Sequence, residues 1–460
     1  MRANPAWPPR RYVGAALLAL LAGCAGAPPA AQGEPPSAVA AAPAASAAAA
    51  PPAASAPPPA SAAASAPATL PAPATGEPLP AATEAALEQR FAAWVDAFRA
   101  SAQAQGIDEA TLHAAFDDVH LLPGVVERDR AQPEFTRTVW DYLDIAVSAR
   151  RVMRGQDQWL QVRVPADAAA ARYGVPSAVL IAIWGIETNY GQVTGSTPVI
   201  DALATLGFDG RREAWARGEL TAALRILQRG DIARAQMVGS WAGAMGQTQF
   251  MPSTFLAYAV DADGDGRCDL WNSAADVLAS TANHLAAAGW RAGEPWGAEV
   301  LLPAGFDLGR ADGRTRQSSA QWAADGLRAA DGTALPELAD AALWLPAGAR
   351  GPALLTGANF RALLAYNNST NYALAVALLA QGIAGGPGVQ TAWPRDLQPL
   401  SRSQVRELQD ALNARGFDSG TVDGLAGPAT RDALRRFQRS VGLPADGYPT
   451  IDLLERLAAP

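Results

Sequence analysis

The sequence predicts a mostly helical α+β protein, in which a helical body carries a small β lobe and is followed by a small three-helix domain. Apolar residues recur at helical spacing from Glu84 to about Gly289 and again over 360–384. Between Trp296 and Gly357, short apolar runs are bracketed by glycine and aspartate, which favours a few short strands. A chain of 460 residues also exceeds what one hydrophobic core usually organises, so two or three folded units are expected.

Residues 1–23 are predicted to be a secretory signal peptide. Basic residues precede an apolar stretch, Val13 to Gly23, which has the length of a signal-peptide core and is too short to span a bilayer. The stretch ends in Leu-Ala-Gly-Cys, which resembles a bacterial lipobox. The resemblance implies cleavage before Cys24 and lipidation of its sulfur and new amino group; an ordinary signal-peptide tail is the alternative. Each buried methylene contributes about 0.8 kcal/mol, so several acyl chains would anchor the protein firmly.

The segment after Cys24 is predicted to be a tether. No aspartate follows Cys24, which in the lipoprotein pattern implies sorting to the outer membrane of a two-membrane cell, with the protein in the periplasm. Residues 24–83 consist almost entirely of alanine, proline, serine and glycine. This composition cannot form a core, and its prolines interrupt alanine helices, so a disordered, semi-extended segment is expected.

The charge balance is mildly acidic, with a formal net charge of −8 at pH 7. Loss of residues 1–23 would remove three of the 36 basic residues and leave 33 against 44 acidic ones, a charge of about −11. This balance argues against nucleic acid as a partner. The chain has two cysteines, and with Cys24 lipidated Cys268 has no partner, so no disulfide within the chain is expected.

One carboxylate ends a long apolar run: nine apolar residues, 178–186, precede Glu187. Pro176 suits the first helical position, and nine residues are too few for a membrane span, so a helix buried on all sides is predicted. The helix dipole and the apolar surroundings both disfavour the ionised form, which raises the carboxyl pKa toward the range of a general acid at neutral pH. The alternative is that Glu187 caps the helix or pairs with an arginine.

The segment Glu-Thr-Asn-Tyr-Gly at 187–191 resembles the catalytic signature of lytic murein transglycosylases, specifically the membrane-bound lytic transglycosylase B family. Further matches follow in order at 200–212, in the glycine-rich run 239–252 and in Tyr-Asn-Asn-Ser-Thr-Asn-Tyr-Ala at 366–373. The resemblance covers roughly residues 85–385. It implies a catalytic domain over 84–386 with a lysozyme-like core, in which Glu187 is the catalytic residue.

The resemblance also implies a saccharide-binding cleft, built from motif residues Ser240, Gln249, Tyr366, Asn367, Tyr372, Arg211 and Arg212. The serine and the two amides would contact N-acetyl and hydroxyl groups, with structural hydrogen bonding as the alternative. The tyrosines could stack on sugar faces or steady Glu187. The arginines could recognise carboxylates of the peptide stem, although adjacent arginines are often a solvated surface pair. Glycines of the 239–252 run would admit sugar to the backbone or serve tight packing.

The reaction of this family needs one carboxylate rather than two. Glycoside hydrolases generally use an acid and a second carboxylate about 5 to 9 Å apart. A lytic transglycosylase uses the C6 hydroxyl of N-acetylmuramic acid instead, so Glu187 would protonate the leaving oxygen and then accept the hydroxyl proton, without a cofactor for the chemistry. Asp201 or Glu213 could still fold near Glu187. A hydrolytic muramidase and a catalytically silent wall-tethering lipoprotein are the alternatives.

A metal site is predicted at 261–269, where Asp-Ala-Asp-Gly-Asp-Gly-Arg-Cys-Asp reproduces the start of an EF-hand loop. Asn272 stands where an EF-hand has its bidentate glutamate, and the similar calcium site of the family implies that an aspartate further along replaces it. A solvated loop is the alternative. The predicted ligands of a structural Ca²⁺ are the side chains of Asp261, Asp263, Asp265 and Asp276 and the carbonyl of Arg267.

Residues 399–460 are predicted to form a separate domain after a linker at 387–398. Leu408 and Leu412 are helix-spaced, and Gly427-Pro428 opens a second helix that Gly442 stops. The segment 422–430, with its following Phe-Gln and Asp-Gly pairs, resembles the three-helix peptidoglycan-binding domain. The resemblance implies binding to peptidoglycan glycan strands, which would raise the local substrate concentration. A stabilising appendage is the alternative.

Overall fold

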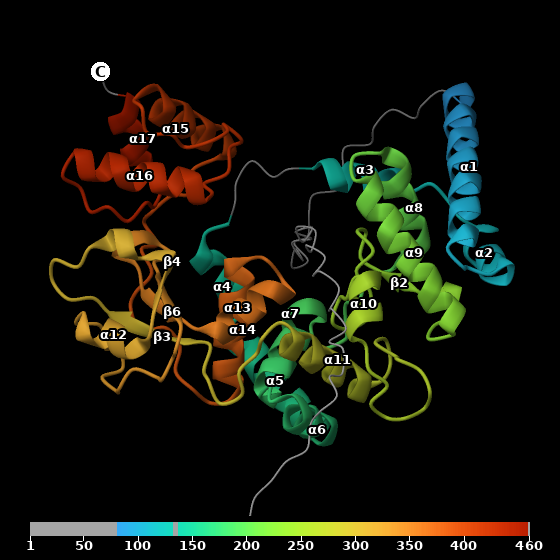
Figure 1. Ribbon diagram of the computed structural model, residues 1–460, viewed down its shortest axis with the longest axis horizontal. Helices are drawn as coiled ribbons and strands as arrows, with labels where there is room; N and C mark the ends of the chain where they lie inside the picture. Colours follow the sequence, from blue (N-terminus) through green and yellow to red (C-terminus); the bar gives the residue numbers. More distant parts are fainter. Residues whose placement is uncertain (1–80, 132–136, 459–460) are drawn as a thin grey trace, which may run out of the picture. The chain divides into compact units, whose positions relative to one another are not determined.

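The computed structural model describes residues 81–131 and 137–458 of the chain (Figure 1). The predicted signal peptide, Cys24 and nearly all of the predicted tether lie outside the described residues. The first helix begins at Ala81, three residues before the predicted start of the catalytic domain. It opens a helical extension that consists of α1 (Ala81–Ala104), α2 (Glu109–Phe116) and α3 (Pro123–Arg130).

The helical body follows and packs around one hydrophobic cluster that runs from α1 to the last helix of the body. Two short strands, β1 (Thr197–Pro198) and β2 (Val238–Gly239), pair antiparallel within it. A 3₁₀ helix, η1 (Arg234–Gln236), precedes β2. The helices are α4 (Val139–Ala146), α5 (Ala149–Gln161), α6 (Arg163–Tyr173), α7 (Ser177–Thr188), α8 (Val199–Asp209), α9 (Glu213–Arg229), α10 (Pro252–Tyr258), α11 (Ala274–Ala287), α13 (Ala358–Tyr366) and α14 (Thr370–Ile383).

The buried helix predicted before Glu187 is α7, and it lies against α5, α6, α11 and α14 (Figure 1). It begins at Ser177, with Pro176 just outside it rather than at its first position. Nine of its twelve residues are buried, so its apolar run is explained by neighbours on every side. Within the described part of the chain, no single helix is long and apolar enough to cross a membrane; α6 and α7 qualify only as a pair, and they are bent by 115°.

The predicted β lobe is confirmed as a five-stranded antiparallel sheet with the order β4-β6-β7-β3-β5. Its small core includes Trp322, Leu343 and Leu355. The predicted apolar runs overlap the ends of β3 and β6, whereas β4 is a largely exposed polar strand at the sheet edge. The elements are β3 (Gly297–Leu301), η2 (Leu308–Arg310), β4 (Asp312–Gln317), α12 (Ser319–Ala324), β5 (Arg328–Ala329), β6 (Ala341–Trp344), η3 (Gly348–Arg350) and β7 (Ala353–Thr356).

The C-terminal segment forms three helices around its own core, as predicted: α15 (Arg402–Ala414), α16 (Pro428–Ser440) and α17 (Ile451–Ala458). Ser401 and Gln404 form a capping box at the start of α15, and Pro428 occupies the first turn of α16. The buried side chain of Gln409 binds the turn before α16, donating to Asp423 and accepting from its backbone N–H. The turn at Val422-Asp423-Gly424, within the segment 422–430, is therefore held by a hydrogen-bonded amide.

Candidate active site

Glu187 lies in the last turn of α7, at the point where the chain leaves the helix in an uncommon conformation. Asn189 and Tyr190 both adopt left-handed backbone angles, with φ of 52° and 61°. Asparagine tolerates this region, but tyrosine rarely occupies it. Tyr190 is held there because its ring packs edge-on against Trp184 and its hydroxyl donates to the carbonyl of Arg151 at 2.8 Å. The turn that follows Glu187 is thus fixed by packing.

Burial raises the pKa of Glu187 from 4.5 to about 7. The buried hydroxyl of Tyr372 stands beside the carboxyl group and opposes part of that rise, and it makes no hydrogen bond of ordinary geometry with any described residue. No charged side chain of the described chain contributes to the shift. An arginine pair, the alternative raised by the sequence, is therefore absent from this part of the protein. Glu187 remains partly exposed, so a group that is half protonated near neutral pH can still meet a substrate.

Tyr366 and Tyr372 stand beside Glu187, as the sequence motif implied. Their rings are stacked with centroids 6.3 Å apart and planes at 5°. Burial raises the pKa of both hydroxyls well above the usual value, and the charge of Glu187 adds to each rise. The hydroxyl of Tyr366 donates to the carbonyl of Thr248 at 2.8 Å, which ties α13 to the glycine-rich run. Both tyrosines are neutral hydrogen-bonding groups at any ordinary pH.

Two aromatic residues of the site carried no sequence signal. Burial raises the pKa of Tyr142, on α4, to about 12, with a contribution from the Glu187 charge. His284, on α11, stacks on Tyr258 with centroids 4.5 Å apart and lies 4.9 Å from the Tyr366 ring. Burial lowers the pKa of His284 to about 4, so it packs as a neutral ring. In the sequence, each looks like an ordinary core residue of an amphipathic helix.

Two of the three predicted polar cleft residues, Ser240 and Gln249, lie in turns that their own side chains help to fold. Ser240 Oγ accepts from the N–H of Ala244 at 3.0 Å. Gln249 has a φ of 53°, and its Nε2 donates to the carbonyls of Thr194 and Gly246 at 3.1 Å. Asn367 ends α13. These contacts match the structural alternative, and they leave a role toward sugar as a proposal.

The glycines of the same run serve close packing. A Cβ on Gly239 would lie 2.1 Å from the carbonyl oxygen of Ala244, and one on Gly246 would lie 2.8 Å from the Leu270 side chain. Neither distance is tolerable for backbone or for a buried side chain. The packing alternative therefore accounts for these two glycines, because the chain folds back on itself where they stand.

Arg211 and Arg212 are engaged with a buried carboxylate instead of standing free. Arg211 Nε donates to Asp129 Oδ2 at 2.6 Å, and Arg212 contacts Asp129 Oδ1 at 2.7 Å. The Arg212 guanidinium also lies 4.2 Å from the centroid of the Trp215 ring. The pair joins α3 to the start of α9. Asp129 offsets one of the two positive charges, and the predicted recognition of peptide carboxylates stays a prediction.

The two carboxylates considered as possible second catalytic groups are both committed elsewhere. Asp201 is buried, pairs with Arg234 and accepts from the N–H of His120 at 2.9 Å. Glu213 is paired with Arg217 at 3.5 Å on an exposed helix face. Since neither perturbs the pKa of Glu187, the described chain supplies one carboxyl group to this site.

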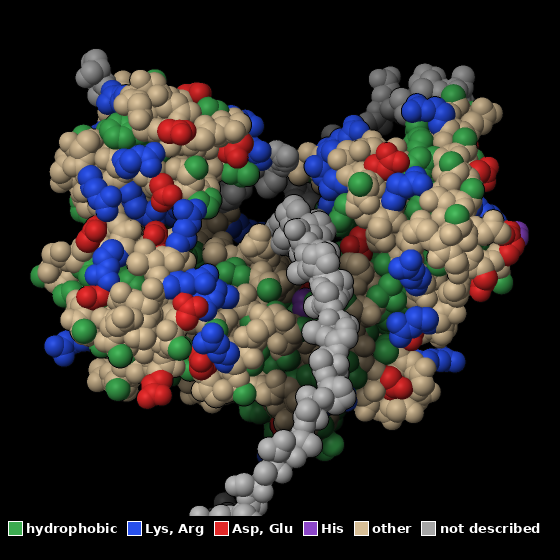
Figure 2. All heavy atoms as spheres, viewed as in Figure 1, with side chains coloured by type: hydrophobic (Ala, Val, Ile, Leu, Met, Phe, Trp, Pro, Cys, Tyr) green, Lys and Arg blue, Asp and Glu red, His purple; other side chains and the backbone are tan. Residues whose placement is uncertain are grey.

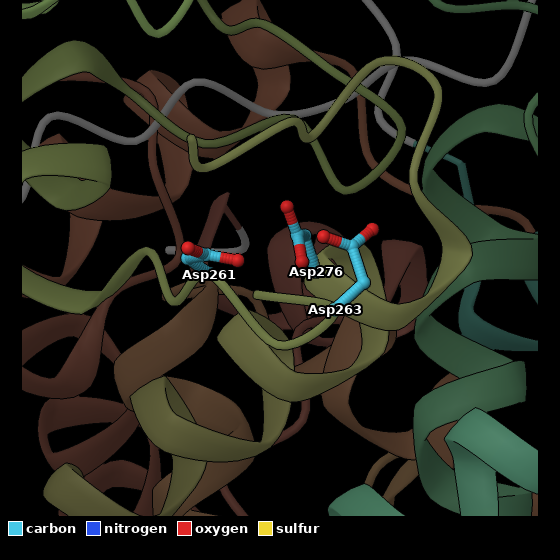
Figure 3. A group of neighbouring side chains, drawn as sticks. All are labelled: Asp261, Asp263 and Asp276. Carbon is cyan, nitrogen blue, oxygen red and sulfur yellow. The ribbon is translucent and has the colours of Figure 1, made fainter. Parts of the chain in front are cut away.

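Three of the predicted metal ligands converge. Carboxylate oxygens of Asp261, Asp263 and Asp276 lie within 4.8 Å of one another, two from the loop and one from the first turn of α11 (Figure 3). Asp276 is fully buried and accepts from the N–H groups of Ala262 and Asp269. Among the described residues, no arginine pairs with any of the three acids. Converging carboxylates without a basic partner suit a hard cation such as Ca²⁺.

Two predicted ligands are not part of that group. Asp265 is exposed and lies outside it. Its Oδ1 accepts from the N–H of Arg267 at 2.9 Å, so the side chain turns back onto its own loop. Asp265 was predicted to be a metal ligand, but its carboxylate does not point to the other three acids in the structure. The role of the Arg267 carbonyl as a metal ligand stays a prediction.

Comparison with known proteins identifies both folded parts. Residues 90–381 match the family model described as "Transglycosylase SLT domain", and residues 401–457 match "Putative peptidoglycan binding domain". The membrane-bound lytic murein transglycosylase B of Escherichia coli K12 is 36% identical over 244 residues, which are 52% of this chain. The match spans 65% of that relative's own length, just under two thirds of it.

Two solved structures are similar. SltB3 of Pseudomonas aeruginosa, in complex with NAG-anhNAM-pentapeptide, is 52% identical with a TM-score of 0.78, covering 80% of this chain and 99% of that one. The Escherichia coli lytic transglycosylase Slt35, in complex with calcium, is 32% identical with a TM-score of 0.54, covering 64% of this chain and 92% of that one. With a glutamate of raised pKa at the end of a buried helix, and a family match over most of the described residues, the chain belongs to the family of proteins with a transglycosylase SLT domain.

Proposed function

We propose that this protein is a lytic transglycosylase that cleaves the β-1,4 bond between N-acetylmuramic acid and N-acetylglucosamine in peptidoglycan. The observation that carries the proposal is Glu187: its pKa of about 7 arises from burial, and no second carboxylate takes part. Family membership and the similarity to SltB3 support it, since SltB3 was solved with NAG-anhNAM-pentapeptide. The expected biological outcome is remodelling and turnover of the cell wall.

One carboxyl group is enough for this reaction. Protonated Glu187 gives its proton to the glycosidic oxygen as the bond to C1 of the muramic acid breaks, and N-acetylglucosamine leaves with a free hydroxyl. The resulting carboxylate then accepts the proton of the C6 hydroxyl, whose oxygen bonds to C1 and closes a 1,6-anhydro ring. Glu187 ends as it began, and no water is consumed. Intramolecular attack has a large effective molarity, which removes the need for a second group to activate water.

The tyrosines and polar residues would position the sugar around that proton transfer. Tyr372 would stabilise the carboxylate formed after the first step, because its unpartnered hydroxyl stands beside the carboxyl group and can donate to the ionised form. Tyr366 would offer an aromatic face. Ser240, Gln249 and Asn367 would orient N-acetyl and hydroxyl groups. Arg211 and Arg212 are not included, because Asp129 already holds both.

A structural Ca²⁺ in the 261–276 loop is a second part of the proposal. Asp261, Asp263 and Asp276 provide oxygen ligands at compatible positions, and the similar Slt35 was solved in complex with calcium. When bound, the ion would neutralise three acids and brace the loop between α10 and α11. It has no role in the chemical steps.

The C-terminal domain, residues 399–460, would hold peptidoglycan strands near the catalytic domain across the linker at 387–398. The family match of 401–457 supports this, as does the basic character of α16, where Figure 2 shows arginine side chains gathered on the face in view. Carboxylates of peptide stems are the complementary groups. Deletion of 399–460 is expected to weaken binding to sacculi and to spare cleavage of soluble glycan strands.

The proposed location is the periplasm, with lipidated Cys24 anchored in the outer membrane and residues 24–83 as the tether. Similarity to a membrane-bound relative supports a wall-facing compartment. Metabolic labelling with a radioactive or alkyne-bearing fatty acid tests the anchor. Label that is incorporated in the native chain and lost in Cys24→Ala supports it, and an unlabelled native chain contradicts it.

The activity is tested by mass spectrometry of muropeptides released from purified sacculi by the native protein and by Glu187→Gln. Products that end in 1,6-anhydro-N-acetylmuramic acid, absent with the variant, support the proposal. Reducing ends heavier by one water identify a muramidase. Binding without release identifies a catalytically silent wall tether.

A further inference from the structure

One residue of the glycine-rich run, Gln247, contacts α7 on both sides of Glu187. The indole N–H of Trp184 donates to Gln247 Oε1 at 2.7 Å. The hydroxyl of Thr188 donates to the backbone carbonyl of Gln247 at 2.6 Å. Trp184 precedes Glu187 by three residues and Thr188 follows it directly, so both bonds act on the helical turn that carries the carboxyl group.

Gln247 is fixed in turn by the loop that leads into α11. Its N–H donates to the carbonyl of Leu270 at 2.7 Å, and its Nε2 donates to the carbonyl of Trp271 at 2.7 Å. Trp271 is itself held, since its indole N–H donates to the carbonyl of Val238 on β2 at 3.2 Å. Every polar group of Gln247 therefore has a partner, and a fully satisfied network in a poorly hydrated region is rigid.

Gly191 shows how closely this network is packed. A Cβ at Gly191 would lie 2.3 Å from Gln247 Oε1 and 3.4 Å from Trp184 Nε1, which are the two atoms of the hydrogen bond that binds α7. The N–H of Gly191 also donates to Thr188 Oγ1 at 3.0 Å. The backbone at Gly191 therefore lies so close to the Gln247 amide that no residue with a side chain fits at position 191.

We propose that Gln247 is a positioning residue for Glu187: its amide joins the end of α7 to the Leu270–Trp271 segment and holds the catalytic carboxyl in register with the substrate. The inference rests on the proposed function and adds a residue to it. A single acid that must first give and then accept a proton is sensitive to its place, because a displacement of about 1 Å can lower a rate by about 100-fold. Gln247 does not contact the reacting atoms.

The first test is a double-mutant cycle with Gln247→Leu and Trp184→Phe. Leucine has a similar size but makes neither side-chain bond, and phenylalanine keeps one aromatic ring while removing the N–H donor together with the second ring of the indole. We expect Gln247→Leu to lower kcat on soluble glycan strands by about 10- to 100-fold with KM within about twofold. Trp184→Phe is expected to lower kcat by a smaller factor. Adding Gln247→Leu to Trp184→Phe should lower kcat by a smaller factor than adding it to the native protein.

If Gln247 had a purely structural role, substitution would change the melting temperature rather than kcat. In that case both variants would melt at a lower temperature but keep the native kcat at a temperature where they are folded. Alternatively, the losses of kcat in the two single variants would simply add in the double variant. A native kcat in the folded variants, or additive losses of kcat, overturns the proposal. Trp184→Phe removes the donor and keeps one aromatic ring in place, so it carries the test if Gln247→Leu does not fold.

Glycine variants provide a matched pair. Gly191→Ala places a methyl group on Gln247 Oε1 at a φ of 76°, whereas Gly230→Ala has nearly the same φ, 77°, and nothing within 4 Å. Both alanine variants therefore bear a similar cost of backbone strain, and only Gly191→Ala adds a contact with Gln247. We expect Gly191→Ala to lower kcat as Gln247→Leu does and Gly230→Ala to keep it. Equal kcat in the two alanine variants overturns the proposal.

The native protein serves as the control that separates the two claims. If it releases no 1,6-anhydro product, the proposed function fails, and this inference falls with it. If the native protein releases that product and the Gln247 and Gly191 variants release it equally fast, only the positioning role is wrong.

Discussion

The hydroxyl of Tyr372 stands beside the carboxyl of Glu187, has no hydrogen-bond partner of its own among the described residues, and holds the pKa of Glu187 below the value that burial alone would set. The two residues come from α14 and α7, far apart in the sequence and packed against each other in the fold. Since a hydroxyl stabilises a carboxylate by donating to it, this contact sets the balance between the acid and base forms that the proposed reaction needs in turn.

Tyr372→Phe is therefore expected to raise the pKa of Glu187 above about 7. The first chemical step needs the protonated acid, so the native kcat/KM should decline as pH rises through about 7. In the variant that decline should begin at higher pH, at a lower maximal rate. The measurement is a pH–rate profile beside Tyr448→Phe, whose ring lies in the C-terminal domain. A decline that stays in place, or moves to lower pH, contradicts the contact.

Glu187 should also make stability depend on pH. Its carboxyl has a usual pKa of 4.5 and a folded-state pKa of about 7, so between these values the folded protein keeps a proton that the unfolded chain releases. The contribution to stability is complete below about pH 4.5 and is lost as pH rises through about 7, on the order of 3 kcal/mol. Glu187→Gln does not titrate and should gain stability relative to the native protein over this window.

The comparison uses urea unfolding of both proteins at pH 5 and pH 8, followed by tryptophan fluorescence. Relative to the native protein, Glu187→Gln should have a higher free energy of unfolding at pH 8 than it has at pH 5. A difference that is the same at both pH values would show that Glu187 is ionised in the folded protein across the range.

Arg212→Gln is expected to destabilise the protein by about 1 to 2 kcal/mol and to leave KM unchanged. The variant loses one of two cations on buried Asp129 and the contact with the Trp215 ring. Arg163→Gln is the control, because its pair with Asp167 is exposed and worth little. Thermal unfolding and steady-state kinetics decide the matter: a KM that rises several-fold at native stability would restore the role toward peptide carboxylates that the sequence resemblance implies.

Calcium is expected to raise the melting temperature of the native protein and to have no effect on Asp276→Asn. Binding at 100 times the dissociation constant stabilises a folded protein by about 2.7 kcal/mol. Differential scanning fluorimetry with added Ca²⁺ or a chelator measures this, and Asp265→Asn should keep most of the response, since its carboxylate lies outside the converging group. An equal response in native protein and Asp276→Asn contradicts the site.

Much of the fold was predictable because its elements have distinct local patterns. The apolar run before Glu187 has to be buried on all sides, and α7 is. The lobe with short apolar strands and the helix that Gly427-Pro428 opens are also confirmed. The strand β4 was not predictable, because an exposed polar edge strand has no apolar alternation.

Residues of the site were predictable only where they belong to a recognisable sequence motif. Glu187 and the two tyrosines of the 366–373 motif could be singled out from the sequence. Tyr142 and His284 come close to Glu187 and Tyr366, respectively, from other helices, and nothing in an amphipathic pattern separates an aromatic residue of the site from one of the core. The pairing of Arg211 and Arg212 with Asp129 was likewise invisible, since it depends on how α3 packs beside α8.

The central claim is that Glu187 alone drives cleavage and that the sugar's own hydroxyl captures C1. The most direct test is digestion of sacculi in water enriched in oxygen-18, with the native protein and Glu187→Gln in parallel, followed by mass spectrometry of the muropeptides. We predict 1,6-anhydro ends without the heavy oxygen from the native protein and no product from the variant. Reducing ends that carry one oxygen-18 atom, or anhydro products made by Glu187→Gln, would contradict the claim.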